Sequence, residues 1–153
     1  MLFRSAIRQN GEALLYVPKE LLDPDKNPNA EKLCLEAIRQ NGWALQYVPE
    51  ELRSETLCLE AVRQDGNALQ YVPEKLLNPA KNPNAERLCL EAIRQNGWVL
   101  RYVPKELLDP ARNPNAEKLC LEAIRQNGEA LLYVPKELLD PDKNPNAEKL
   151  CLE

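Results

Sequence analysis

The sequence predicts an all-α protein, an α-solenoid of short helix-pair repeats of about 24–31 residues each. Two observations predict it: a phrase that recurs along the chain, and helical periodicity of apolar residues inside that phrase. The copies of the phrase begin at Leu2, Leu33, Leu57, Leu88, Leu119 and Leu150, with a variant form at the first and only the opening at the last. A period of this size is typical of repeat architectures, in which each unit stacks on its neighbours.

The first helix of a repeat is clearest in the copy that begins at Leu33. At 100° per residue, one face collects the apolar side chains Ala30, Leu33, Cys34, Ala37 and Ile38. Asn27-Pro28 predicts an N-cap followed by a proline in the first turn, and Ser54 or Thr56 serves as the cap in the shorter repeat.

Asn41-Gly42 is expected to end this helix, with the glycine in the left-handed conformation that closes many C-termini. A second, shorter helix is predicted at residues 43–48, with Ala44, Leu45 and Val48 on one side. Pro49 ends it, because a residue before proline is pushed out of the helical region.

The predicted organisation is a single repeat array over residues 1–153. Its repeats span 2–32, 33–56, 57–87, 88–118, 119–149 and, in part, 150–153. The long repeats carry seven extra residues rich in proline, Asp and Asn, which predict surface loops. Residues 6–36 and 123–153 are identical at every position. The chain starts and stops inside a helix, which is expected of a window from a longer array, and uncapped terminal faces favour head-to-tail self-association.

Composition argues against several functions. The net charge is −4 with both signs interspersed, so neither nucleic acid nor a membrane surface is an expected partner. The chain has no histidine, the commonest general base and a common metal ligand. No nucleophile has a base beside it in the sequence, so we expect no enzyme activity, no cofactor and no metal.

The five cysteines occupy one equivalent position per repeat: Cys34, Cys58, Cys89, Cys120 and Cys151. Neighbouring helices lie about 8–10 Å apart, too far for a disulfide between equivalent positions. The sequence therefore predicts reduced thiols packed as small apolar side chains, and a cytoplasmic or other reducing intracellular location.

The loop from Asp23 to Glu31 alternates oxygen-bearing residues and so offers a calcium-binding alternative. A calcium loop, however, needs glycine at its sixth position and glutamate at its twelfth, where this chain has Pro28 and Cys34. Turn formation and helix capping account for the same residues without a metal.

One face of the second helix varies between repeats. The position four residues before each tyrosine reads Glu12, Trp43, Asn67, Trp98 and Glu129. We expect a position that accepts Glu, Asn and Trp to be at the surface, with each tryptophan at least half exposed beside its own tyrosine at i+4. Variation on one face of an otherwise constant repeat is typical of partner selection, and Trp, Tyr and Arg are the usual anchors. The candidate binding residues are Trp43, Gln46, Tyr47, Trp98, Arg101 and Tyr102.

The segment Glu36–Leu52 resembles the tandem repeats called Domain of Unknown Function 4116, in which an apolar helix ends in Ala-Val-x-x-Asn-Gly, followed by x-Ala-Leu-x-Tyr and Glu-Glu-Leu. The resemblance implies a helical repeat module without an assigned activity or functional residues. A leucine-rich repeat is the competing fold, since the shorter repeat spacing is common there, although the longer spacing exceeds its usual range.

The sequence thus predicts a non-catalytic repeat scaffold that binds an unknown protein or peptide through the variable second-helix face. A purely structural spacer or assembly array and, less favoured, a calcium-binding repeat are the alternatives.

Overall fold

All regular secondary structure described in the computed structural model is helical. The structure describes residues 2–152, and within that range no residue belongs to a β-strand. The all-α prediction is therefore confirmed, and the strand that a leucine-rich repeat requires in every unit is missing there. The chain divides into two compact units, Met1–Pro73 and Glu74–Glu153.

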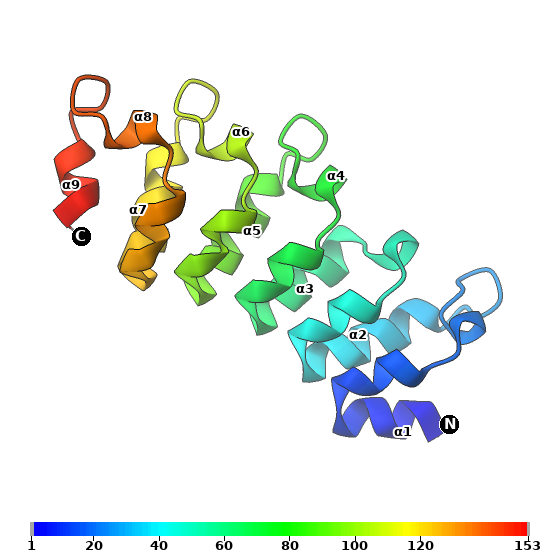
Figure 1. Cartoon of the computed structure of the whole chain (residues 1–153). Helices are drawn as coiled ribbons and strands as arrows, with labels where there is room; N and C mark the ends of the chain where they lie inside the picture. Colours follow the sequence, from blue (N-terminus) through cyan, green and yellow to red (C-terminus); the bar gives the residue numbers. More distant parts are fainter. Residues whose placement is uncertain (1, 153) are drawn as a thin grey trace. The chain divides into compact units, whose positions relative to one another are not determined.

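In the first unit, the long helix of each repeat contacts that of the next: α1 packs on α2, and α2 on α3 (Figure 1). The short helices make a second row, in which η1 contacts η3 and η3 contacts η5. The elements of this unit are α1 (Leu2–Gln9), η1 (Gly11–Tyr16), η2 (Lys19–Leu21), α2 (Ala30–Gln40), η3 (Gly42–Tyr47), η4 (Glu50–Leu52), α3 (Glu55–Gln64) and η5 (Gly66–Tyr71).

The second unit repeats this arrangement with the longer connectors. Its long helices α5 and α7 contact each other, as do its short helices η6 and η7, and Figure 1 shows the loops of this unit along one edge. Its elements are α4 (Glu74–Leu77), α5 (Ala85–Gln95), η6 (Gly97–Tyr102), α6 (Lys105–Leu108), α7 (Ala116–Gln126), η7 (Gly128–Tyr133), α8 (Lys136–Leu139) and α9 (Ala147–Leu152).

The apolar face of the first helix packs as the sequence predicts. Ala30, Cys34, Ala37 and Ile38 of α2 are fully buried, and Leu33 is partly buried. Ser54 caps α3 by accepting a hydrogen bond from the Leu57 N–H at 3.3 Å. The predicted cap at Asn27 is wrong, because α2 begins at Ala30 after Asn29. Asn27 instead holds the loop: its Oδ1 accepts from the Asn29 N–H and its Nδ2 donates to the Leu21 carbonyl.

The second helix has the predicted buried residues but a different geometry. Ala44, Leu45 and Val48 are buried, as expected. The segment Gly42–Tyr47, however, is a 3-10 helix rather than an α-helix. Asn41 caps it from one end, and Val48 lies in the extended region before Pro49 at the other. These two residues confine the helix to six residues, which is still longer than most 3-10 helices.

The predicted left-handed glycine is also wrong, since no glycine has a positive φ within the described range. Asn41 leaves the helix in an extended conformation, and Gly42 begins the next helix. A Cβ on Gly42 would lie 2.5 Å from the Ala61 carbonyl oxygen of α3. Glycine is therefore needed here because two neighbouring repeats approach each other closely, not because of a special backbone angle.

Three of the four long loops are stabilised by a buried asparagine, Asn82, Asn113 or Asn144, whereas Asn27 of the first loop is only partly buried. Asn113 is representative: its Nδ2 donates to the Leu107 carbonyl at 2.7 Å, and its Oδ1 accepts from the Asn115 N–H at 2.9 Å. Over residues 2–152, no helix is long and apolar enough to span a bilayer.

Candidate functional site

The two tryptophans lie at the second position of their short helices, and both are partly buried. The expectation of at least half exposure is therefore wrong. Each ring packs on a tyrosine of the following repeat: Trp43 on Tyr71 and Trp98 on Tyr133, with ring centroids 5.7 Å apart in both cases. The tryptophans thus bridge consecutive repeats.

The expected pairing of each tryptophan with its own tyrosine at i+4 assumed an α-helix. In a 3-10 helix the side chains at i and i+3 lie on one line, so the residue in line with Trp98 is Arg101. Its guanidinium carbon lies 5.6 Å from the centre of the Trp98 ring.

In the first unit, an acidic residue holds Trp43 in place. The indole Nε1 donates a 2.6 Å hydrogen bond to Asp65 Oδ2. The other oxygen of Asp65 caps η5 by accepting from the Asn67 N–H at 2.9 Å. Asp65 was not among the predicted binding residues, although it differs from the asparagine that the other copies have at this position. That single Asp among asparagines was the signal available in the sequence.

The other two candidate binding residues of this unit, Gln46 and Tyr47, are partly buried. The Gln46 carbonyl accepts a 3.1 Å hydrogen bond from Arg53, whose guanidinium also donates to the Tyr71 carbonyl at 2.9 Å. Arg53 in the short connector thereby joins the ends of η3 and η5.

In the second unit, three predicted residues come together with a fourth. Arg101 is exposed and donates from Nη2 to the Tyr102 hydroxyl at 2.6 Å, with its guanidinium carbon 4.6 Å from the Tyr102 ring centre. These contacts, led by the hydrogen bond to Tyr102, raise the pKa of Arg101 above its ordinary value. We call Trp98, Arg101, Tyr102 and Tyr133 the aromatic–arginine cluster.

Tyr133 connects this cluster to a hollow of about 410 Å³. The remaining walls come from α6, α8 and the segments that flank them: Lys105, Leu108, Asp109, Pro110, Pro135 and Glu137. The rim carries both signs of charge, and the walls include two prolines and a leucine. The cluster and the hollow together offer a continuous surface with aromatic, cationic and apolar contacts.

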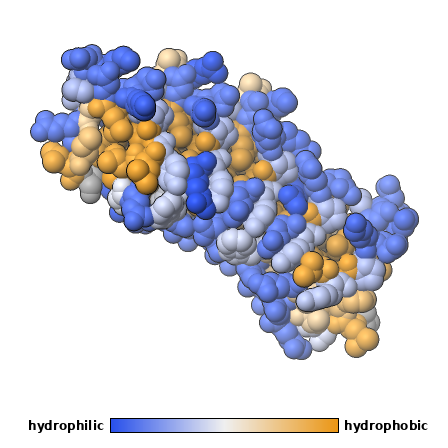
Figure 2. All heavy atoms as spheres, viewed as in Figure 1, coloured by the Kyte–Doolittle hydropathy of each residue, from blue (hydrophilic) through white to orange (hydrophobic). Residues whose placement is uncertain are grey.

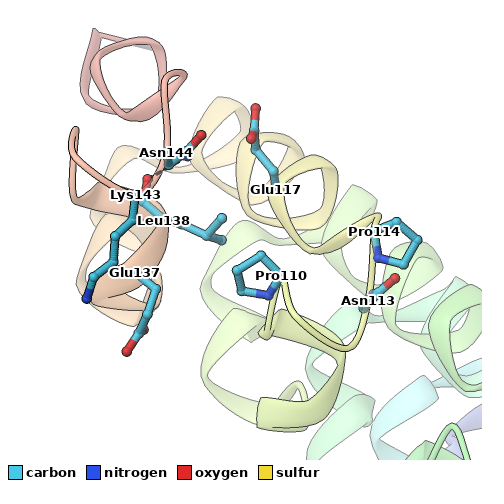
Figure 3. A pocket seen from close by; sticks show the side chains of 8 residues that line it. All are labelled: Pro110, Asn113, Pro114, Glu117, Glu137, Leu138, Lys143 and Asn144. Atoms are coloured by element: carbon cyan, nitrogen blue, oxygen red, sulfur yellow. Dashed lines mark hydrogen bonds between the residues drawn. The ribbon is translucent and has the colours of Figure 1, made fainter.

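A second kind of hollow lies between consecutive loops and recurs with the repeat. One, of about 290 Å³, is lined by Pro110, Asn113, Pro114, Glu117, Glu137, Leu138, Lys143 and Asn144 (Figure 3). Figure 3 shows the Leu138 side chain pointing toward Pro110 across it. A hollow of about 310 Å³ lies one repeat earlier, where Pro79, Leu107 and Arg112 replace Pro110, Leu138 and Lys143. Sequence reasoning missed these hollows because each forms only when two loops lie side by side.

The calcium-loop residues form turns in the structure. Asp23 Oδ1 accepts from the Asp25 N–H at 2.9 Å, and this hydrogen bond is the main reason that the pKa of Asp23 is lowered. Within residues 2–152, no three His, Cys, Asp or Glu side chains are grouped so that they could hold a metal ion.

The family comparison covers the region where the repeat spacing is shortest. Residues 31–77 match the family Domain of unknown function (DUF4116). This match extends from α2 to α4 and confirms the resemblance seen in the repeated phrase. No curated protein matches the chain, and no solved structure does.

Proposed function

We propose that this chain is a non-catalytic α-solenoid scaffold that binds a protein or peptide through the aromatic–arginine cluster. The solenoid is inferred from the stacking within each unit, where long helices contact long helices and short helices contact short helices. The observation that carries the binding role is the exposed Arg101 guanidinium held between the rings of Trp98 and Tyr102.

This arrangement suits recognition for two reasons. Trp, Tyr and Arg are the residue types that most often dominate binding energy at interfaces. The guanidinium is also held by its neighbours before any partner arrives, so less side-chain freedom is lost on binding. Arg101 has donors beyond the one used for Tyr102, and they fit a carboxylate of the partner. The hollow beside Tyr133 accepts an adjacent apolar side chain.

The chain supplies its own replacement residues for the test. The repeat of η5 has Asn67 and Gln70 where η6 has Trp98 and Arg101. The double variant Trp98→Asn/Arg101→Gln therefore carries residues that this position already accommodates. Trp43→Asn in the first unit is the matched control.

The experiment selects peptides from a random displayed library on the wild-type chain and measures their affinities by fluorescence polarisation. The double variant should bind the selected peptides at least tenfold more weakly, while Trp43→Asn should bind them as the wild type does. Equal binding by the double variant would reject the cluster as the site. Selection of no binding peptide would favour the structural spacer.

A further inference from the structure

Two side chains at the boundary between η6 and η7 carry hydrogen-bond donors without an acceptor. Trp98 is the second residue of η6, and Asn127 directly precedes η7. Asn127 Oδ1 accepts from the Glu129 N–H at 3.0 Å, so Nδ2 is the amide atom left for another partner. Within residues 2–152, the structure shows no hydrogen bond from Trp98 Nε1 or from Asn127 Nδ2. The two groups cannot satisfy each other, because both only donate.

Both donors are reached by solvent. Trp98 and Asn127 are partly buried. Among the described residues, no side-chain nitrogen or oxygen that is shielded from solvent lacks a hydrogen-bond partner. Trp98 Nε1 and Asn127 Nδ2 have no such partner, so both atoms are accessible, and a ligand with a suitable acceptor can bond to them.

The first unit shows which acceptor each kind of donor takes. The tryptophan of η3, Trp43, donates from Nε1 to Asp65 Oδ2 at 2.6 Å. The asparagine before η3, Asn41, donates from Nδ2 to Glu12 Oε1 at 3.4 Å. In both cases the acceptor is a carboxylate oxygen on the other side of a repeat boundary. The boundary between η6 and η7 has both donors and neither carboxylate.

Trp43 and Trp98 lie in equivalent surroundings. Each indole ring centre is 5.7 Å from the tyrosine ring of the following repeat, with angles of 65° and 55° between the ring planes. Asp65 uses Oδ1 to cap its helix and Oδ2 to bind the indole. Asn127 also caps through Oδ1, which leaves Nδ2 in the place of Oδ2. Two N–H groups therefore meet where the first unit has one N–H and one acceptor.

We propose that this boundary binds the side-chain carboxylate of an Asp or Glu residue of the partner, with Trp98, Asn127 and Arg101 as its donors. This inference rests on the proposed function, since it names the chemical group that the aromatic–arginine cluster recognises. Arg101 supplies the positive charge, because its guanidinium carbon lies 5.6 Å from the centre of the Trp98 ring. Hydrogen bonds between charged groups are roughly twice as strong as neutral ones, so a carboxylate is preferred to an amide.

The surroundings also indicate what accompanies the acidic residue. Figure 2 shows hydrophobic residues gathered over the α7 and α8 region, and Leu108, Pro110 and Pro135 are among the residues that line the hollow beside Tyr133. Peptides with an apolar residue close to the acidic one should therefore bind best.

Asn127→Asp is a variant that fills the site from within. Asp65 shows that an aspartate at this position keeps the helix cap and bonds to the preceding tryptophan. The variant should therefore stay folded, with Trp98 Nε1 bonded internally and a negative charge that repels an external carboxylate. Asp65→Asn, the reciprocal change in the first unit, is the matched control.

The direct test follows the two indole N–H signals by NMR while sodium acetate, the carboxylate probe, is added at constant ionic strength. Trp43→Asn assigns the two signals. Acetate should shift the Trp98 signal saturably, whereas acetamide, its neutral counterpart, should not. The Trp43 signal should stay in place, because Asp65 already occupies its indole. In Asn127→Asp the response of Trp98 to acetate should be lost. No shift with acetate, an equal shift with acetamide, or an unchanged response in Asn127→Asp would overturn the proposal.

The peptides selected on the wild-type chain give the second arm of the test. They should contain Asp or Glu, and exchange of that residue for Asn or Gln should weaken binding at least tenfold. Asn127→Asp should weaken binding to the same extent, while Asp65→Asn should bind as the wild type does.

Failure of this inference differs from failure of the proposed function. Selected peptides without an acidic residue, or with equal affinity for Asn127→Asp, would reject the carboxylate site and keep the cluster as a peptide site. An acetate-dependent shift of the Trp98 signal without any selected peptide would support the carboxylate site and reject the peptide-binding role.

Discussion

The segments 6–36 and 123–153 have the same sequence but differ in burial. Cys34 is fully buried, whereas Cys151 is exposed; Gly11 is buried, whereas Gly128 is exposed. The tyrosines differ in the opposite direction, since Tyr16 is exposed and Tyr133 is partly buried beneath the Trp98 ring. Identical residues thus lie in different environments, because in a repeat structure the neighbouring repeats provide most of the contacts.

The same comparison has an energetic consequence. A side chain that is buried in one copy should contribute more to stability than the same side chain where a neighbour is missing. Substitutions at matched positions test this directly.

The largest difference is expected for Leu14→Ala and Leu131→Ala. Leu14 is buried, so its truncation should cost about 2–5 kcal/mol of unfolding free energy. Leu131 already contacts solvent, and its truncation should cost less than half as much. Urea unfolding followed by circular dichroism measures both. Equal losses would show that burial at this position does not depend on the following repeat.

The next difference is expected for Gly11→Ala and Gly128→Ala. A Cβ at Gly11 collides with the backbone of α2, and overpacking of this kind costs about 1–3 kcal/mol. A Cβ at Gly128 points into open space, so alanine there should be neutral or stabilising by up to about 1 kcal/mol through the unfolded chain. Thermal unfolding of the two variants measures both changes in stability. Destabilisation by Gly128→Ala would contradict the open space found around Gly128.

The smallest difference concerns the thiols and appears only at alkaline pH. Burial is the main cause that raises the pKa of Cys34, Cys89 and Cys120 from 9.0 to about 12. The folded state therefore keeps these protons while the unfolded state releases them. Stability should be unaffected by the thiols below pH 9 and should fall between pH 9 and about 12.

Cys34→Ala and Cys151→Ala form the matched pair for this pH dependence. Cys34→Ala should reduce the loss of unfolding free energy between pH 8 and pH 11, relative to its own value at pH 8. Cys151→Ala should leave that loss unchanged, since Cys151 is exposed. Urea unfolding at several pH values gives the two slopes, and identical slopes would refute a role for the buried thiol.

Part of the candidate site could be predicted from the sequence. Trp98 and Arg101 were identified because their positions vary on one face of a constant repeat, and Tyr102 was added as a usual interface anchor next to them. The three residues do come together. Their fourth member, Tyr133, comes from the next repeat, and a pattern within one repeat does not reveal it. Asp65 was missed although it is the one Asp among equivalent asparagines.

The sequence by itself determined the repeats, the helical class and the buried positions. Ala44, Leu45 and Val48 could be assigned to the core because apolar periodicity reports which side chains avoid water. It also located the end of the first helix through Asn41 and the end of the second through Pro49, whose preferences are local, but it misplaced the start of the first helix at Asn27.

The tertiary structure decided how neighbouring repeats meet. It assigned Gly42 to a close backbone approach instead of a left-handed turn, and placed Trp43 against Tyr71 instead of in solvent. It also gave identical segments different burial. These features depend on atoms from two repeats at once, and the residues of one repeat do not specify the distance to the next.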